Sequence, residues 1–322
     1  MLARINDHSS SAARGDARPP AILIGPIAGA QKVEVRIRGE HFTTYHYGDS
    51  RHVPFLWPVK AEGGVGVTRN YPMGSDEPSI TDHPHHLSLY LTYGVLNGLD
   101  FWHKGRRNDG VIRTVELETG AGADYAWIRA HKHWIANDDG RVVMEEQREL
   151  RFHDSDASAR VFDFISTFQA TQGDVTFGDT KEGMIGFRMS PALDGDRGGV
   201  LTNADGLQRE RAVYGKPSPW MDYTGELPGV GKRGVALFDH PDNTPRGHWH
   251  VRNYGLASLN PFGSRSISRQ ASGEHTLPQG EELTFQYRFL VHSGDHEEAD
   301  VAGHYQRYTE MGRGQRALHQ QR

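Results

Sequence analysis

Apolar and polar residues alternate along several stretches of the chain, most clearly at residues 33–38, 87–92 and 283–289. A period of two residues is typical of strands that bury one face and expose the other. Turn-forming residues separate these stretches, and the Asn-Asp-Asp-Gly segment at 137–140 predicts a hairpin between two long strands. The pattern therefore predicts an all-β fold, built as a large antiparallel β-sandwich.

The domain organisation follows from where this pattern begins and ends. Residues 1–19 are rich in serine, glycine and proline, and we expect a disordered N-terminal lead there. Residues 20–295 form a single sandwich domain, in which the segment 192–233, rich in glycine, aspartate and proline, is expected to form long loops. Residues 296–322 form a C-terminal helix and tail, because apolar positions recur there at helical spacing behind an acidic first turn.

Composition narrows the classes of function. The 322 residues include no cysteine, which excludes disulfides and thiolate chemistry, and the net charge of -5 gives no basic surface for nucleic acid. No stretch approaches the roughly 20 apolar residues of a membrane-spanning helix, and the first 20 residues lack the apolar core of a secretory signal. Strand–helix alternation and the motifs GxGxxG and GxxxxGK are also missing. We therefore expect a cytoplasmic protein that acts on a small molecule and not on a membrane or nucleic acid, with its oligomeric state left open.

Histidine, the usual acid–base group near neutral pH and a common metal ligand, occurs 19 times and is clustered. The densest cluster is Asp82-His83-Pro84-His85-His86, and in an extended strand His83 and His85 would share one face. Arg69, Asn70 and Trp102 accompany this cluster in sequence.

Two further segments carry candidate chemistry. In the first, His248 and His250 would share a face of a strand that leads to Arg252 and, a little later, Asn260. The second places Lys181 and Glu182 at the head of a strand. The pair formed by His131 and His133 also alternates along a strand, but we interpret it as two ordinary strand histidines because no comparable cluster surrounds it.

These segments together resemble a known family, the soluble bacterial domains catalogued as "methane oxygenase PmoA". The matching strings lie in the order 68–74, 81–86, 97–102, 178–184, 248–255 and 260–263, and the resemblance spans roughly residues 20–295. It implies a supersandwich fold similar to that of galactose mutarotase, and a sugar-derived substrate. The family name would imply methane oxidation, but the membrane subunit of that name is a helical integral membrane protein, unlike this chain.

The candidate residues fit an acid–base enzyme, an epimerase, lyase or hydratase acting on a sugar or keto-sugar. Such a reaction needs one group to remove a proton and another to return it. We expect the catalytic groups to be His83, His85, His86, Glu182 and His250. The expected substrate-binding residues are Arg69, Asn70, Trp102, Lys181, His248, Arg252 and Asn260.

Two alternatives stay open. The first is a metal-dependent hydrolase, lyase or oxygenase, in which His83, His85, His248 and His250 would bind a divalent metal ion as cofactor. The second is a non-catalytic carbohydrate-binding sandwich, which would need aromatic platforms but no titrating pairs. The sequence by itself does not show whether the histidine pairs converge.

Overall fold

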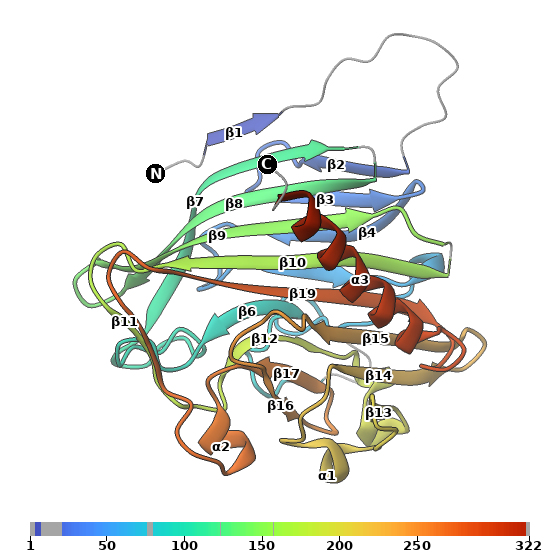
Figure 1. Cartoon of the computed structure of the whole chain (residues 1–322). Coiled ribbons are helices and arrows are strands. Elements are labelled where there is room, and N and C mark those ends of the chain that lie inside the picture. Colours follow the sequence, from blue (N-terminus) through green and yellow to red (C-terminus); the bar gives the residue numbers. More distant parts are fainter. Residues whose placement is uncertain (1–3, 8–20, 76–79, 123, 157, 320–322) are drawn as a thin grey trace.

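The computed structural model describes residues 4–7, 21–75, 80–122, 124–156 and 158–319, and two large β-sheets dominate this part of the chain (Figure 1). The larger sheet has nine strands, antiparallel except for the parallel β1–β7 pair. In spatial order they are β1 (Arg4–Asp7), β7 (Gly110–Ala121), β8 (Tyr125–Ala136), β9 (Val142–His153), β10 (Ala159–Gln169), β19 (Glu282–Ser293), β15 (Gly231–Asp239), β14 (Trp220–Leu227) and β13 (Val200–Asn203).

The second large sheet has eight strands, all paired in antiparallel fashion. In spatial order they are β16 (His248–Val251), β17 (Leu256–Asn260), β12 (Gly183–Arg188), β6 (Leu89–Tyr93), β5 (Phe55–Val59), β4 (Glu40–His46), β3 (Lys32–Ile37) and β2 (Ile22–Pro26).

Short elements complete the described fold. A two-stranded sheet joins β11 (Val175–Phe177) and β18 (His275–Leu277). The helical elements are α1 (Glu210–Val213), α2 (Ser264–Ser268), α3 (Val301–His319) and the 3₁₀ turns η1 (Glu62–Gly64), η2 (Pro191–Leu193) and η3 (Gly195–Arg197). The helix α3 lies against the outer face of the nine-stranded sheet (Figure 1), where Val301 and Tyr308 pack with Phe238 of β15 and Leu290 of β19.

The two large sheets pack face to face and enclose the main hydrophobic core. Aromatic contacts bridge the two layers: Phe42 of β4 lies with its ring centroid 6.2 Å from that of Phe152 of β9, and Phe187 of β12 lies 6.2 Å from Phe289 of β19. Strand β3 buries alternate residues, as its sequence pattern predicts. The prediction of a large antiparallel β-sandwich with a C-terminal helix is confirmed.

The alternation at residues 87–92 leads to a wrong prediction of burial, because β6 is buried on both faces. Leu89 and Leu91 point into the core, whereas Tyr90 and Thr92 point outward and are nevertheless covered by loops that cross the outer face of the eight-stranded sheet. A central strand with both faces covered favours no polar side. The covering loops carry most of the candidate site.

Three other segments can be compared with their predictions. The hairpin at 137–140 joins β8 to β9, and the amide of Ala136 donates to the carbonyl of Arg141 over 3.0 Å. The segment 192–233 is not a set of long loops: it contains β13, α1, β14 and the start of β15. Within the expected lead, Arg4–Asp7 form the strand β1, and residues 8–20 lie outside the described part of the chain.

Candidate functional site

The candidate site lies on the outer face of the eight-stranded sheet, across β6, β12, β17 and β16. The strand register pairs Tyr90 with Gly186, Gly186 with Ser258, and Ser258 with His250. Directly paired residues project to the same face of a sheet, so these four form a row. Tyr90 and His250 stand at its two ends, with only small residues between them.

The Asp82–His86 segment crosses above this row as a turn and not as a strand. The amide of His86 donates to the carbonyl of His83 over 3.0 Å, and His83 has a left-handed backbone conformation with φ of 42°. The prediction that His83 and His85 share a strand face is therefore wrong. Instead the rings of His83 and His86 stack, with centroids 4.9 Å apart, and His85 meets His86 edge-on at 4.5 Å.

Two buried arginines hold this turn in place. Arg69 donates to Asp82 Oδ1 over 2.6 Å and to the carbonyls of Asp82, His83 and His86. Arg188 at the end of β12 donates to both carboxylate oxygens of Asp82, over 3.0 and 3.2 Å. The side chain of Arg69 is fully buried, so its geometry favours positioning of the loop over the substrate binding that the sequence suggested.

Asp82 is held as a carboxylate. Burial works against the charged form, but the charge of Arg188, hydrogen bonds from His83 and Arg188, and the charge of Arg69 together lower the pKa of Asp82. An ionised carboxylate accepts hydrogen bonds and cannot donate them. The 2.9 Å contact between His83 Nδ1 and Asp82 Oδ2 therefore requires a proton on Nδ1.

His83 is consequently oriented for proton transfer. Its ring contacts those of His86 and Tyr254, with centroids 4.9 and 5.0 Å away, while 40% of the side chain stays exposed. With Nδ1 bonded to Asp82, the neutral form of His83 carries its lone pair on Nε2. Among the candidate histidines, His83 combines a carboxylate partner with access from solvent.

His85 and His86 are kept neutral by their surroundings. Burial, followed by the charges of neighbouring histidines beginning with His103, lowers the pKa of His85 to about 3. Burial is also the main cause that lowers the pKa of His86 far below its ordinary range, and His86 Nδ1 accepts a 3.2 Å hydrogen bond from Arg188. Trp102 lies beside His86 with its side chain fully buried, so it forms a wall of the site and not an exposed stacking platform.

His250 also presents a lone pair. Its Nδ1 lies 2.9 Å from the carbonyl of Lys181, which can only accept, so Nδ1 carries the proton and Nε2 is an acceptor. This Nε2 is buried and has no hydrogen-bond partner, and the same is true of the Tyr90 hydroxyl. Burial first, and then the charge of Arg252, lowers the pKa of His250 to about 3.

The strand register brings these segments together on one face of the sheet. The charge of His83 contributes to lowering the pKa of His250, and the charge of Glu182, after burial, contributes to raising the pKa of Tyr90. Glu182 is partly exposed and lies 3.8 Å from the Lys181 ammonium. Three segments distant in sequence thus contribute to one polar site.

Other predicted site residues have structural partners. His248 Nδ1 bonds the Ser268 hydroxyl over 2.8 Å, and fully buried Asn260 donates to the carbonyl of Thr180 over 2.7 Å. Asn70 accepts a 3.1 Å hydrogen bond from the Trp57 indole. Arg252 packs over the Tyr214 ring at 4.7 Å and pairs with Glu210 at 3.4 Å.

The four-histidine metal site, which the sequence left open as an alternative, does not form among the described residues. Within the described ranges, the group of three or more histidine or acidic residues whose ligand atoms all lie within 4.8 Å consists of His131, His133 and Glu145, and includes none of the four. The reason is local: the turn at 83–86 carries His85 toward His103, whereas His248 points to α2.

Sequence reasoning missed several members of the site. Four further residues contact the Asp82–His86 turn or the arginines that hold it: Arg188, Tyr90, Tyr254 and His103. An arginine that ends the apolar strand at 183–188 was the clearest available signal, since a buried charge requires a partner.

Comparisons with known proteins place the chain in a family. A family model described as "Family of unknown function (DUF6807)" matches residues 32–306, so the chain belongs to this family. The "methane oxygenase PmoA" family gives no match, and no curated protein matches.

One solved structure similar to this chain is a GalM/aldose epimerase homologue from C. elegans. The match has a TM-score of 0.31 and 9% identity, covering 85% of this chain and 100% of that chain. The sheet topology described above establishes the β-sandwich independently of this match. No helix in the described part of the chain is long and apolar enough to cross a membrane.

Proposed function

We propose that this member of a family of unknown function is an acid–base enzyme of the isomerase or lyase type, acting on a small hydroxyl-rich molecule such as a sugar or keto-sugar. The observation that carries the proposal is the Asp82–His83 pair, in which a clamped carboxylate bonds Nδ1 of a partly exposed imidazole. The same arrangement in other enzymes fixes the tautomer and orientation of a catalytic histidine.

In this mechanism His83 Nε2 accepts a proton from the substrate, and Asp82 stabilises the imidazolium that forms. The carboxylate stays ionised, because Arg69 and Arg188 hold it on the other side. A second group must return the proton or protonate an oxygen. We assign this role to Glu182, since its carboxylate is partly exposed and it directly precedes β12, the strand that carries Gly186 of the same row.

The hydroxyl-rich substrate is inferred from the unpaired polar atoms. A buried donor or acceptor without a partner costs free energy, so the Tyr90 hydroxyl and His250 Nε2 favour a ligand that hydrogen-bonds to them. The Lys181 ammonium is half exposed and could stabilise a developing enolate oxygen. Together the acceptor His250 Nε2, the Tyr90 hydroxyl and the Lys181 ammonium favour binding of a polyol or keto-sugar over binding of an apolar ligand.

Proton exchange would test the proposal directly. The purified protein is incubated with a panel of aldoses, ketoses and sugar acids in D₂O, and NMR follows deuterium incorporation, epimerisation and loss of water. We expect His83→Ala to lower the rate on the responsive substrate by about 10²–10⁴-fold, the usual contribution of an acid–base group. The matched control is His248→Ala, because His248 bonds Ser268 away from the dyad and its removal should leave the rate within roughly threefold of wild type.

Two outcomes would reject this assignment. A His83→Ala variant that is folded and fully active would exclude the dyad as the proton carrier. Sugar binding by wild-type protein that is weakened by changes at Tyr90 or His250, without exchange or turnover on any substrate, would identify a binding module instead.

A further inference from the structure

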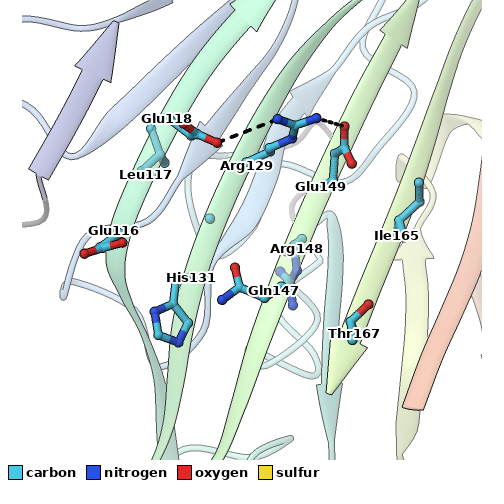
Figure 2. Close-up of a pocket in the computed structure, with 11 residues that line it drawn as sticks. Glu116, Leu117, Glu118, Arg129, His131, Gln147, Arg148, Glu149, Ile165 and Thr167 are labelled. Atoms are coloured by element: carbon cyan, nitrogen blue, oxygen red, sulfur yellow. Dashed lines mark hydrogen bonds and ion pairs between the residues drawn. The ribbon is translucent and has the colours of Figure 1, made fainter. Parts of the chain in front are cut away.

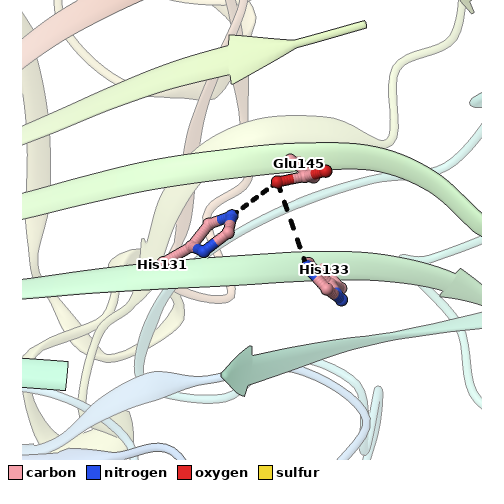
Figure 3. Close-up of side chains that lie close together, drawn as sticks. All are labelled: His131, His133 and Glu145. Carbon is pink, nitrogen blue, oxygen red and sulfur yellow. Dashed lines mark hydrogen bonds and ion pairs between the residues drawn. The ribbon is translucent and has the colours of Figure 1, made fainter. Parts of the chain in front are cut away.

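A second cluster of ionisable residues lies on the other sheet, far from the groups used above. His131 and His133 are two residues apart on β8, and Glu145 on β9 is the direct cross-strand partner of His133. Alternate residues of a strand, and directly paired residues of neighbouring strands, share a face. All three side chains therefore project from the outer face of the nine-stranded sheet, as Figure 3 shows.

Their distances suit a shared ion. Glu145 Oε2 lies 2.7 Å from His131 Nε2 and 4.0 Å from His133 Nε2, and the ligand atoms all lie within 4.8 Å of one another. Ligands bound at about 2.0–2.1 Å around a tetrahedral zinc ion are separated by roughly 3.3 Å. The two observed distances bracket that value, so small side-chain rotations would place all three atoms around one ion.

The surroundings of the cluster support this use. The hydroxyl of Thr171 donates to Glu145 Oε1 over 2.9 Å, which orients the carboxylate and leaves Oε2 toward the histidines. Such hydrogen bonds to a ligating carboxylate are typical of metal sites. Between 20% and 29% of each of the three side chains is exposed, so solvent or a ligand can approach the cluster.

We propose that His131, His133 and Glu145 bind a divalent transition-metal ion of the Zn²⁺ class. Two histidines and one carboxylate supply three ligands, a set that zinc and non-haem iron sites both use, and the exposed side leaves further positions open. This site is separate from the Asp82–His83 dyad, because it lies on the outer face of the opposite sheet.

A pocket adjoins the proposed metal site and could hold a ligand that reaches the ion. Its volume is about 460 Å³, and His131 belongs both to the metal cluster and to the pocket wall. Figure 2 shows Glu116, Gln147 and Thr167 around the same pocket, with Arg129 held between Glu118 and Glu149. A small oxygen-rich ligand in this pocket could reach an open position on the ion and contact Arg129.

Metal titration tests the proposal. Metal-free protein is titrated with Zn²⁺ by calorimetry, and with Co²⁺ by visible absorption, which reports on the ligand geometry. We expect wild type to bind one equivalent, and His133→Ala and Glu145→Gln each to weaken binding by roughly 100-fold or more, since each removes a ligand. Circular dichroism establishes that each variant is folded.

Two controls separate this site from other histidines. His153→Ala removes a histidine from the same sheet that also bonds a carboxylate, Asp163, at 2.7 Å but, among the described residues, belongs to no cluster of three candidate ligands. His83→Ala removes the proposed acid–base group. Both should bind Zn²⁺ with wild-type affinity. Absence of tight binding by wild type, or equal binding by the folded Glu145→Gln and His133→Ala variants, would overturn the proposal without affecting the proposed acid–base function.

Discussion

Replacing Asp82 by Asn should both weaken the fold and disable the site, because one carboxylate pairs with two buried cations and with His83, the proposed catalytic group. Its oxygens accept from Arg69 over 2.6 Å, from Arg188 over 3.0 and 3.2 Å, and from His83 over 2.9 Å. The amide keeps the shape of the side chain but removes the charge. Both guanidinium groups, which are almost fully buried, then lose their counter-ion.

The magnitude follows from the burial of the partners. Breaking a fully buried ion pair by removing one member costs about 3–5 kcal/mol. The Asp82 side chain is 37% exposed, and solvent screening reduces the expected cost to about 2–3 kcal/mol. With an unfolding entropy of about 2.1 cal/mol/K per residue, this corresponds to a decrease in Tm of about 3–4 °C for the whole chain.

Calorimetry and denaturant unfolding would measure this change, with Asp49→Asn as the matched control. Asp49 pairs with Arg113 at 3.1 Å but is 69% exposed, so its loss should shift Tm by less than about 1 °C. The pKa of folded Asp82 is lowered, so its contribution to stability is present above the ordinary pKa of 3.8 and is lost only as pH falls through the lower folded value. The difference between variant and wild type should therefore be equal at about pH 6 and pH 8. An Asp82→Asn protein as stable as wild type would refute the role given to the buried arginines.

Two further predictions concern stability. Burial lowers the pKa of His52 to about 4 and that of His250 to about 3, whereas both side chains have a pKa near 6.5 in the unfolded chain. Lowering the pH below 6.5 should therefore destabilise the folded state, by about 2 kcal/mol for each histidine at pH 5. Urea unfolding at a series of pH values would measure this loss. Glu146→Gln should cost about 3–5 kcal/mol in chemical denaturation, because the fully buried carboxylate pairs with Arg148 at 2.7 Å and accepts from Trp134 and Ser166.

A control variant tests each of these two stability predictions. If the histidine assignment is right, replacing His250 by Gln flattens the pH dependence between about pH 5 and 6.5, and an unchanged slope would contradict it. For Glu146, the control in the same strand is Glu149, whose side chain is 17% exposed, since Glu149→Gln breaks only partly exposed pairs with Arg129 and Arg151. Equal effects of the two changes would contradict the importance of burial.

The sequence by itself determined the local structure well where one face of a strand meets the core. The alternation at 33–38 predicts β3 correctly, and the turn residues at 137–140 predict the β8–β9 hairpin. It failed where burial is not one-sided. At residues 87–92 both faces of β6 are covered, and that covering comes from loops whose path no local pattern records.

In the candidate site too, the sequence predicts the local clusters, and the tertiary structure decides how they meet. The sequence is sufficient to identify the clusters at 81–86, 181–182 and 248–252, because histidine or charged residues are concentrated there. Their convergence depends on the order β6–β12–β17–β16 in the eight-stranded sheet. The contacts of Arg69 and Arg188 hold residues 82–86 in a turn that places Asp82 beside His83. These contacts therefore decide which histidine is proposed to transfer the proton.

The proposed metal site shows most clearly what the sequence could not determine. His131 and His133 alternate along one strand, and sequence alone gave no reason to prefer them over any other such pair. Their proposed role as metal ligands depends on Glu145, which lies opposite His133 because of the register between β8 and β9. A sequence fixes which residue types alternate along a strand, but the pairing register decides which of them meet across the sheet.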